Sequence, residues 1–114
     1  MTATLVVTAL LAALLGFAGL IKVAGVQQSL TVRDHLGLNP VQWRTIGSLE
    51  LAAVAGLLAG LKWPPIGVAA AAGSALLLVG AIGFHARASD SAGETAPAVI
   101  GLGLAVATAI LQLG

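Results

Sequence analysis

The run TLVVTALLAALLGFAGLIKVAGV at residues 4–26 decides the fold class. It exceeds the roughly 20 apolar residues that a helix needs to cross a bilayer, and Lys22 is its one charged side chain. A signal peptide begins with basic residues and has a shorter apolar core, so we interpret this run as a helix of the mature protein. The chain therefore begins with an expected membrane span.

Three further apolar runs follow, and we expect helices at about residues 41–61, 66–86 and 97–113. Trp63-Pro64-Pro65 separates two of them because successive prolines cannot continue a helix, and Pro97 suits the start of the last. None of the runs has the polar face of a helix in a soluble bundle. The sequence predicts one all-α domain over residues 1–114, an integral membrane four-helix bundle.

The composition excludes several classes of function. The 114 residues are 59% hydrophobic and 8% charged, which leaves no room for a soluble catalytic domain. A net charge of +1 gives no surface for nucleic acid, and the lack of cysteine excludes disulfides, thiol nucleophiles and thiolate-bound metals. No metal-ligand spacing, phosphate loop or nucleophile elbow occurs, so we expect no metal.

Small residues recur four positions apart, an arrangement that lets membrane helices approach closely. The pairs are Ala12 and Gly16, Gly56 and Gly60, Ala69 and Gly73, and Gly101 and Ala105. They predict a tight bundle. They also lead us to expect a homo-oligomer, most simply a dimer, with Gly56 and Gly101 in its contacts.

The basic residues predict the orientation of a multi-pass protein in the cell membrane. Lys22, Arg33, Arg44 and Arg87 flank one side of the spans, and Lys62 flanks the other. Since basic residues favour the cytoplasm, loops 27–39 and 87–96 are expected there, with both termini outside. The first of these loops is long enough for an amphipathic segment that dips into the interface or forms a partly re-entrant lid. Its apolar residues would be Leu30, Val32, Leu36 and Leu38, and Arg33, Asp34 and His35 would stay in water.

Glu50 is the most informative residue, because a glutamate two to three turns inside a span is costly unless it is paired or reaches water. Lys22, on the packing face of the first span, is its expected partner, and Arg44 is the alternative partner. His85 ends the third span on the same side of the membrane. We name Glu50, Lys22 and His85 as candidate catalytic residues. A structural ion pair and interfacial anchoring remain the alternative interpretations of these residues.

Three other polar side chains are candidates for binding a substrate. Arg44 lies at the level of Glu50, Ser74 shares a helix face with His85, and Thr108 lies on a small, mildly polar stripe of the last helix. Snorkelling of Arg44 and ordinary close packing of Ser74 and Thr108 are the simpler explanations.

Four segments together resemble the DoxX-like family of small four-helix membrane proteins. They are Gly19-Leu20-Ile21-Lys22, His35-Leu36-Gly37-Leu38-Asn39-Pro40, Ile46-Gly47-Ser48-Leu49-Glu50-Leu51 and Phe84-His85-Ala86-Arg87. The resemblance implies that Gly47 belongs to the family signature with Lys22, Glu50 and His85, and we add Gly47 to the binding candidates. The family name derives from a subunit of a thiosulfate:quinone oxidoreductase, so the resemblance implies oxidoreductase-associated membrane proteins and allows a quinone as cofactor. It implies no single activity.

Three hypotheses for the function follow. In the first, an intramembrane polar pocket around Glu50 binds a lipophilic small molecule, such as a membrane lipid or quinone, for acid–base or quinone-linked chemistry. In the second, the chain is a non-catalytic subunit that recruits a soluble redox enzyme through loop 27–39. In the third, it is a small proton-coupled multidrug exporter, although such pumps carry their glutamate on the first helix and line their chamber with aromatic residues.

Overall fold

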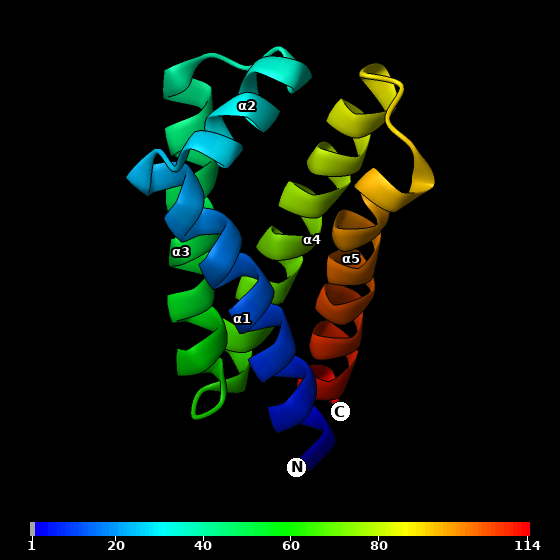
Figure 1. Ribbon diagram of the computed structural model, residues 1–114. Helices are drawn as coiled ribbons and strands as arrows, with labels where there is room; N and C mark the ends of the chain where they lie inside the picture. The colour runs from blue at the N-terminus through cyan, green and yellow to red at the C-terminus, as the bar shows by residue number, and fades with distance from the viewer. Residues whose placement is uncertain (1) are drawn as a thin grey trace.

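The computed structural model describes residues 2–114 and contains five helices. They are α1 (Thr2–Ala24), α2 (Gln27–Leu36), α3 (Pro40–Gly60), α4 (Pro64–Arg87) and α5 (Ala92–Leu113) (Figure 1). The all-α prediction is confirmed.

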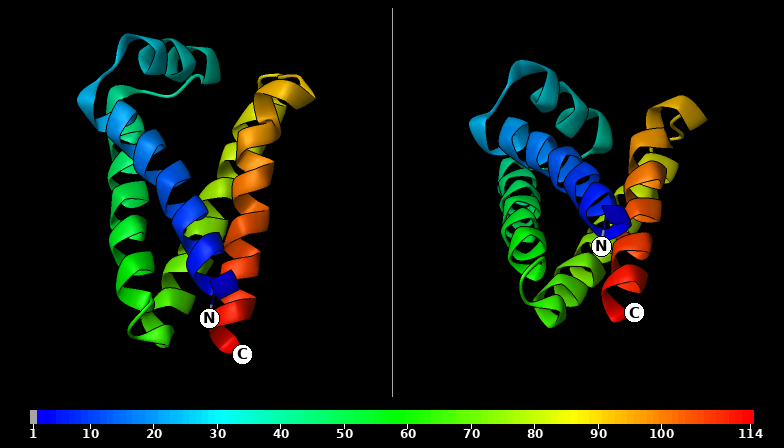
Figure 2. Two further views of the ribbon diagram at one scale, coloured as in Figure 1. Left: turned by 60° about the horizontal axis from the view of Figure 1, so that its bottom comes forward. Right: turned by 90° about the horizontal axis from the view of Figure 1, so that it is seen from below.

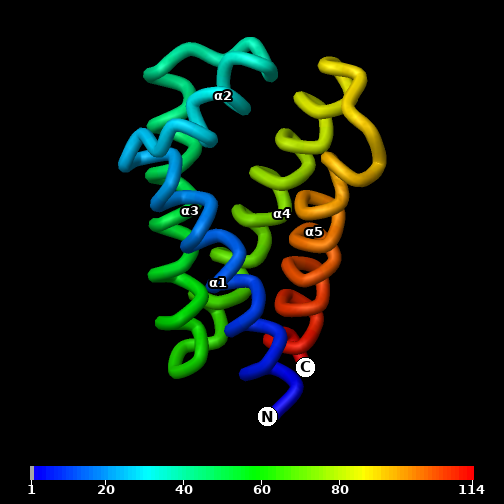
Figure 3. Tube along the Cα trace, in the orientation of Figure 1, coloured from blue at the N-terminus to red at the C-terminus, as the bar shows by residue number. Residues whose placement is uncertain are grey.

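The four long helices run lengthwise, and the short α2 lies across one end of them (Figures 1 and 2). α1 packs against α3 and α5, α3 against α4, and α4 against α5. The chain termini lie at the end opposite α2, and the α4–α5 loop lies at the same end as α2 (Figure 1). α3 and α4 are close at the end that joins them and diverge toward α2 (Figure 3).

Three helices, α1, α4 and α5, are long and apolar enough to cross a membrane. α3 has 21 residues, but its first half carries Gln42, Arg44 and Glu50, and it is not among the three. The prediction of a four-helix bundle is therefore confirmed only in part: the protein is an all-α membrane protein, and residues 2–114 form five helices.

The segment 27–39, expected as a loop with an amphipathic stretch, contains the separate helix α2. Gly37 ends it with a φ of 76°, a left-handed conformation that favours glycine at a helix end. Leu36 and Leu38, which were expected to dip into the membrane interface, are buried against Trp43 inside the protein.

The last helix begins earlier than expected, and the loop after α4 is correspondingly shorter. Ser91 and Glu94 form a capping box that satisfies the first backbone N–H groups and starts α5 at Ala92. Pro97 therefore lies inside α5, where the sequence analysis placed it at the start. The capping signal, rather than the proline, decides this boundary.

Several of the small residues lie at contacts between helices of the same chain. A Cβ added to Gly60 would lie 2.2 Å from Cα of Gly67, and one added to Gly56 would lie 2.8 Å from Cβ of Ala70, so these positions hold α3 against α4. Gly101 is likewise in contact within the chain. Because Gly56 and Gly101 are used inside one copy, they no longer argue for the dimer, and the oligomeric state stays a prediction.

Candidate functional site

A pocket of about 760 Å³ lies where α3 and α4 diverge. Its walls are mostly apolar side chains of these two helices, and Val32, Leu36 and Leu38 of the α2 segment close one end. Gly73 and Gly80 of α4 face it with nothing within 4 Å of an added Cβ. Leu49 and Leu76 belong to the lining and are 50% and 76% exposed, so the pocket opens at the side of the bundle.

The charged groups of the pocket lie at its α2 end. Nζ of Lys22 is 2.9 Å from Oε1 of Glu50, and the two side chains are 14% and 9% exposed. The expected pairing of these residues is therefore present. Within residues 2–114 Lys22 is the one side chain that pairs with Glu50, which leaves part of the carboxylate's acceptor capacity unused.

Trp43 joins this polar end to α2. Trp43 is 5% exposed, and its Nε1 donates a hydrogen bond of 2.9 Å to Oγ of Ser29. Nζ of Lys22 lies 4.9 Å from the centre of the ring, within the range of a cation–π interaction. The Trp43 side chain packs among Leu36, Leu38 and Ile46.

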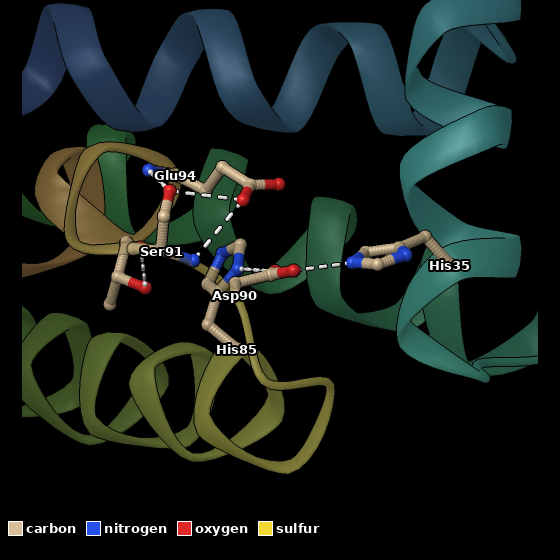
Figure 4. A network of polar contacts seen from close by, with 6 residues as sticks. His35, His85, Asp90, Ser91 and Glu94 are labelled. Carbon is tan, nitrogen blue, oxygen red and sulfur yellow. Dashed lines mark hydrogen bonds and ion pairs between the residues drawn. The ribbon is translucent and has the colours of Figure 1, made fainter.

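His85 lines the pocket and is held from outside by Asp90. Its Nδ1 lies 2.5 Å from Oδ2 of Asp90, and the other oxygen of Asp90 contacts Nε2 of His35 on α2 (Figure 4). The hydrogen bond to Asp90 raises the pKa of His35, and the bonds to His35 and His85 lower the pKa of Asp90. This network ties α2 to α4 and to the α4–α5 loop.

Arg87 adds a second tie between α2 and α4. Its guanidinium donates to the backbone oxygen of Leu36 at 3.1 Å and lies 4.8 Å from the centre of the Phe84 ring. The α2 helix is thus fixed over the pocket by polar contacts and by the buried side chains of Leu36 and Leu38.

The candidate residues divide by position. Lys22, Glu50 and His85 line the pocket. Gly47 lies beneath Lys22, because a Cβ added there would be 2.8 Å from the lysine Cβ. Arg44 is exposed and does not line the pocket.

Ser74 and Thr108 are fully buried, and neither lines the pocket. Their hydroxyls donate to the backbone oxygens of Ala70 and Leu104, which satisfies them within their own helices. The simpler explanation, close packing, fits both.

Sequence reasoning missed Asp90 and the contacts of His35 and Trp43. The predicted topology placed the segments of His35, His85 and Asp90 on one side of the membrane, and that was the available signal. It did not give their contact, because α2 was not expected to fold back over the end of α4.

A sequence model of the DoxX-like family matches residues 6–108. The chain belongs to the DoxX-like family. The match covers all of the pocket residues of this DoxX-like chain and both members of the Lys22–Glu50 pair. No curated protein and no solved structure matches the chain significantly.

Proposed function

We propose that this DoxX-like membrane protein binds a lipophilic small molecule in the pocket between α3 and α4. One observation carries the proposal: an apolar pocket that opens sideways has Lys22, Glu50 and His85 gathered at one end. A ligand pocket typically combines apolar walls with a few polar groups that orient the ligand. The proposal includes α3 as a fourth span, since it packs along α1 and α4 and its glutamate is paired.

The two ends of the pocket indicate the chemistry of the ligand. Ile66, Ala69 and Ala70 at the far end suit a hydrocarbon body, and the Lys22–Glu50 pair suits a polar head. The Lys22 ammonium donates hydrogen bonds and the Glu50 carboxylate accepts them. A head group with a carbonyl or hydroxyl oxygen on an apolar body fits both ends.

The same groups are suited to proton transfer. Asp90 beside Nδ1 of His85 favours the tautomer that carries its proton on Nδ1, which leaves Nε2 as an acceptor. Glu50 is the second acid–base group and Lys22 balances its charge. Acid–base chemistry on the bound head group is therefore the reaction class that we propose.

A quinone is one molecule of this shape. When bound, it would supply the redox chemistry, and the chain would supply hydrogen bonds to its carbonyl oxygens from Lys22. Glu50 and His85 would hold or move the protons. The proposal does not extend to thiosulfate.

Tryptophan fluorescence tests the proposal, because the chain has two tryptophans and Trp43 alone lines the pocket. A Trp63→Phe background leaves Trp43 as the single reporter. Purified protein in nanodiscs is titrated with decylubiquinone, which quenches indole emission. Saturable quenching at Trp43 is expected, with weaker affinity in Glu50→Gln.

A matched pair of variants separates the pocket from general partition into lipid. Gly80→Phe places a ring in the pocket, whereas Gly83→Phe lies on α4 outside it, and an added Cβ meets nothing within 4 Å at either position. Gly80→Phe should weaken binding about tenfold or more and Gly83→Phe should not. Equal, non-saturable quenching in all variants would remove the proposal and favour recruitment of a soluble enzyme through α2.

A further inference from the structure

A second cluster of side chains lies at the end of the bundle where α2 approaches the α4–α5 loop. His35 of α2, Asp90 of the loop and Glu94 of α5 each offer one ligand atom, and these atoms all lie within 4.8 Å of one another. Three separate segments are thus brought to one point (Figure 4). None of the three residues lines the pocket.

The cluster carries two carboxylates, those of Asp90 and Glu94. No lysine or arginine of residues 2–114 forms an ion pair with either of them. Arg33 pairs with Asp34, and Arg87 is engaged by Leu36 and Phe84. Asp90 is therefore paired with imidazole groups alone, and Glu94 forms no ion pair within residues 2–114. A site with this charge attracts a cation.

Asp90 is fixed before any ion binds. Its side chain is 3% exposed, and His85 holds Oδ2 while Oδ1 is directed at His35. A carboxylate ligand is commonly oriented by such a hydrogen bond from a second residue.

Glu94 is fixed in a similar way. Its Oε1 accepts from the backbone N–H of Ser91 at 3.1 Å and from the Ser91 hydroxyl at 3.0 Å. The other oxygen points away from these bonds in Figure 4 and is free to coordinate.

Although the sequence spacing led us to expect no metal, we propose that His35, Asp90 and Glu94 bind a divalent transition-metal ion of the zinc class, with His85 orienting Asp90. One imidazole nitrogen with two carboxylate oxygens suits Zn²⁺ better than Ca²⁺ or Mg²⁺, which take oxygen ligands. Bonds of about 2 Å to a tetrahedral ion place ligand atoms roughly 3.3 Å apart. The exposed side chains of His35 and Glu94 reach this separation by small rotations.

The ion would hold α2, which closes one end of the pocket, to the start of α5. The site does not depend on the proposed function, because its three ligands lie outside the pocket and it needs no ligand there. His85, which lines the pocket, only orients Asp90.

Cobalt absorption tests the site directly. Full-length protein without a histidine tag is purified in detergent, treated with EDTA, desalted and titrated with Co²⁺, and Zn²⁺ is then added as competitor. One equivalent of Co²⁺ should give the visible d–d bands of a low-coordinate N/O site, and Zn²⁺ should displace it.

The variants separate ligands from neighbours. Glu94→Gln keeps an oxygen for the Ser91 cap, and His35→Ala lies outside the long helices, so both should fold, as circular dichroism would check. Each should weaken binding tenfold or more, as should Asp90→Asn, and His85→Phe should weaken it about 10- to 100-fold. Asp34→Asn, next to His35 on α2, is the matched control and should bind as the wild type does.

Three results would overturn the site. They are no saturable binding by the wild type, unchanged affinity in His35→Ala and Glu94→Gln, and an equal loss in Asp34→Asn. The cluster would then be a hydrogen-bonded contact between α2 and the loop, and any bound ion adventitious only.

Discussion

Lys22 of α1 and Glu50 of α3 form an ion pair across the contact of these helices, with 2.9 Å between Nζ and Oε1. Two glycines make the approach possible. A Cβ on Gly47 would lie 2.8 Å from Cβ of Lys22, and one on Gly19 would lie 2.9 Å from the backbone oxygen of Gly47. The ion pair therefore depends on glycine at positions 19 and 47, where a larger residue would push α1 and α3 apart.

The first prediction separates the structural and functional roles of this pair. Lys22→Met or Glu50→Gln leaves one polar group buried without its partner, and removing one partner of a buried pair costs about 3 kcal/mol or more. We expect both single variants to lose thermal stability in detergent. Lys22→Met/Glu50→Gln should recover much of it, because no charge is then stranded.

Ligand binding supplies the second readout of the same variants. Binding of the quinone probe should stay impaired in the double variant, because the head-group contacts are missing. Recovery of binding together with stability would show a purely structural pair. Wild-type binding in Glu50→Gln alone would remove Glu50 from the site.

The second prediction concerns the contact that sets the divergence of α3 and α4. Gly60→Ala places a methyl group 2.2 Å from Cα of Gly67, and neither backbone can yield without separating the helices. A loss of about 2 kcal/mol or more is expected, in line with other overpacked contacts. Gly103→Ala, where an added Cβ meets nothing within 4 Å, is the control and should be neutral. Equal thermal stabilities of the two variants would contradict the close approach.

The third prediction tests how α2 is held. Ser29→Ala leaves the buried Trp43 N–H without its acceptor, which costs about 1–3 kcal/mol. Local opening of α2 should then raise amide exchange over Gln27–Leu36. Trp43→Phe combined with Ser29→Ala removes both partners and should exchange more slowly than Ser29→Ala alone. Unchanged exchange in Ser29→Ala would show that Leu36 and Leu38 suffice to hold α2.

The fourth prediction is the orientation in the membrane. Cysteines introduced at Ser89 and at Thr2 lie at opposite ends of the helices, so a membrane-impermeant maleimide should label them from opposite sides of the membrane. The distribution of basic residues predicts that Ser89 lies in the cytoplasm. Labelling of both from the same side would mean that the chain crosses the membrane an even number of times between Thr2 and Ser89, and α3, which is not among the three most apolar helices, would then not be a span.

The sequence by itself determined the helical class, the membrane setting and the Lys22–Glu50 pairing. Long apolar runs admit few structures in a bilayer, since every backbone group must be bonded within its own helix. The pairing follows because a buried charge needs a partner, and Lys22 was available on a neighbouring span. The prediction that Pro64 and Pro65 mark a break between two helices is also confirmed, since α3 ends at Gly60 and α4 begins at Pro64.

Tertiary structure alone decided where α2 lies, how α3 and α4 diverge, and which polar residues share the pocket. The sequence marks Gly60 and Gly73 alike as small residues, yet one is in a backbone contact and the other faces the pocket. The contact between His35 and Asp90 is also decided by tertiary structure. Their contact depends on a short helix folding across the bundle end, where burial of Leu36, Leu38 and Trp43 fixes a position that no local pattern encodes.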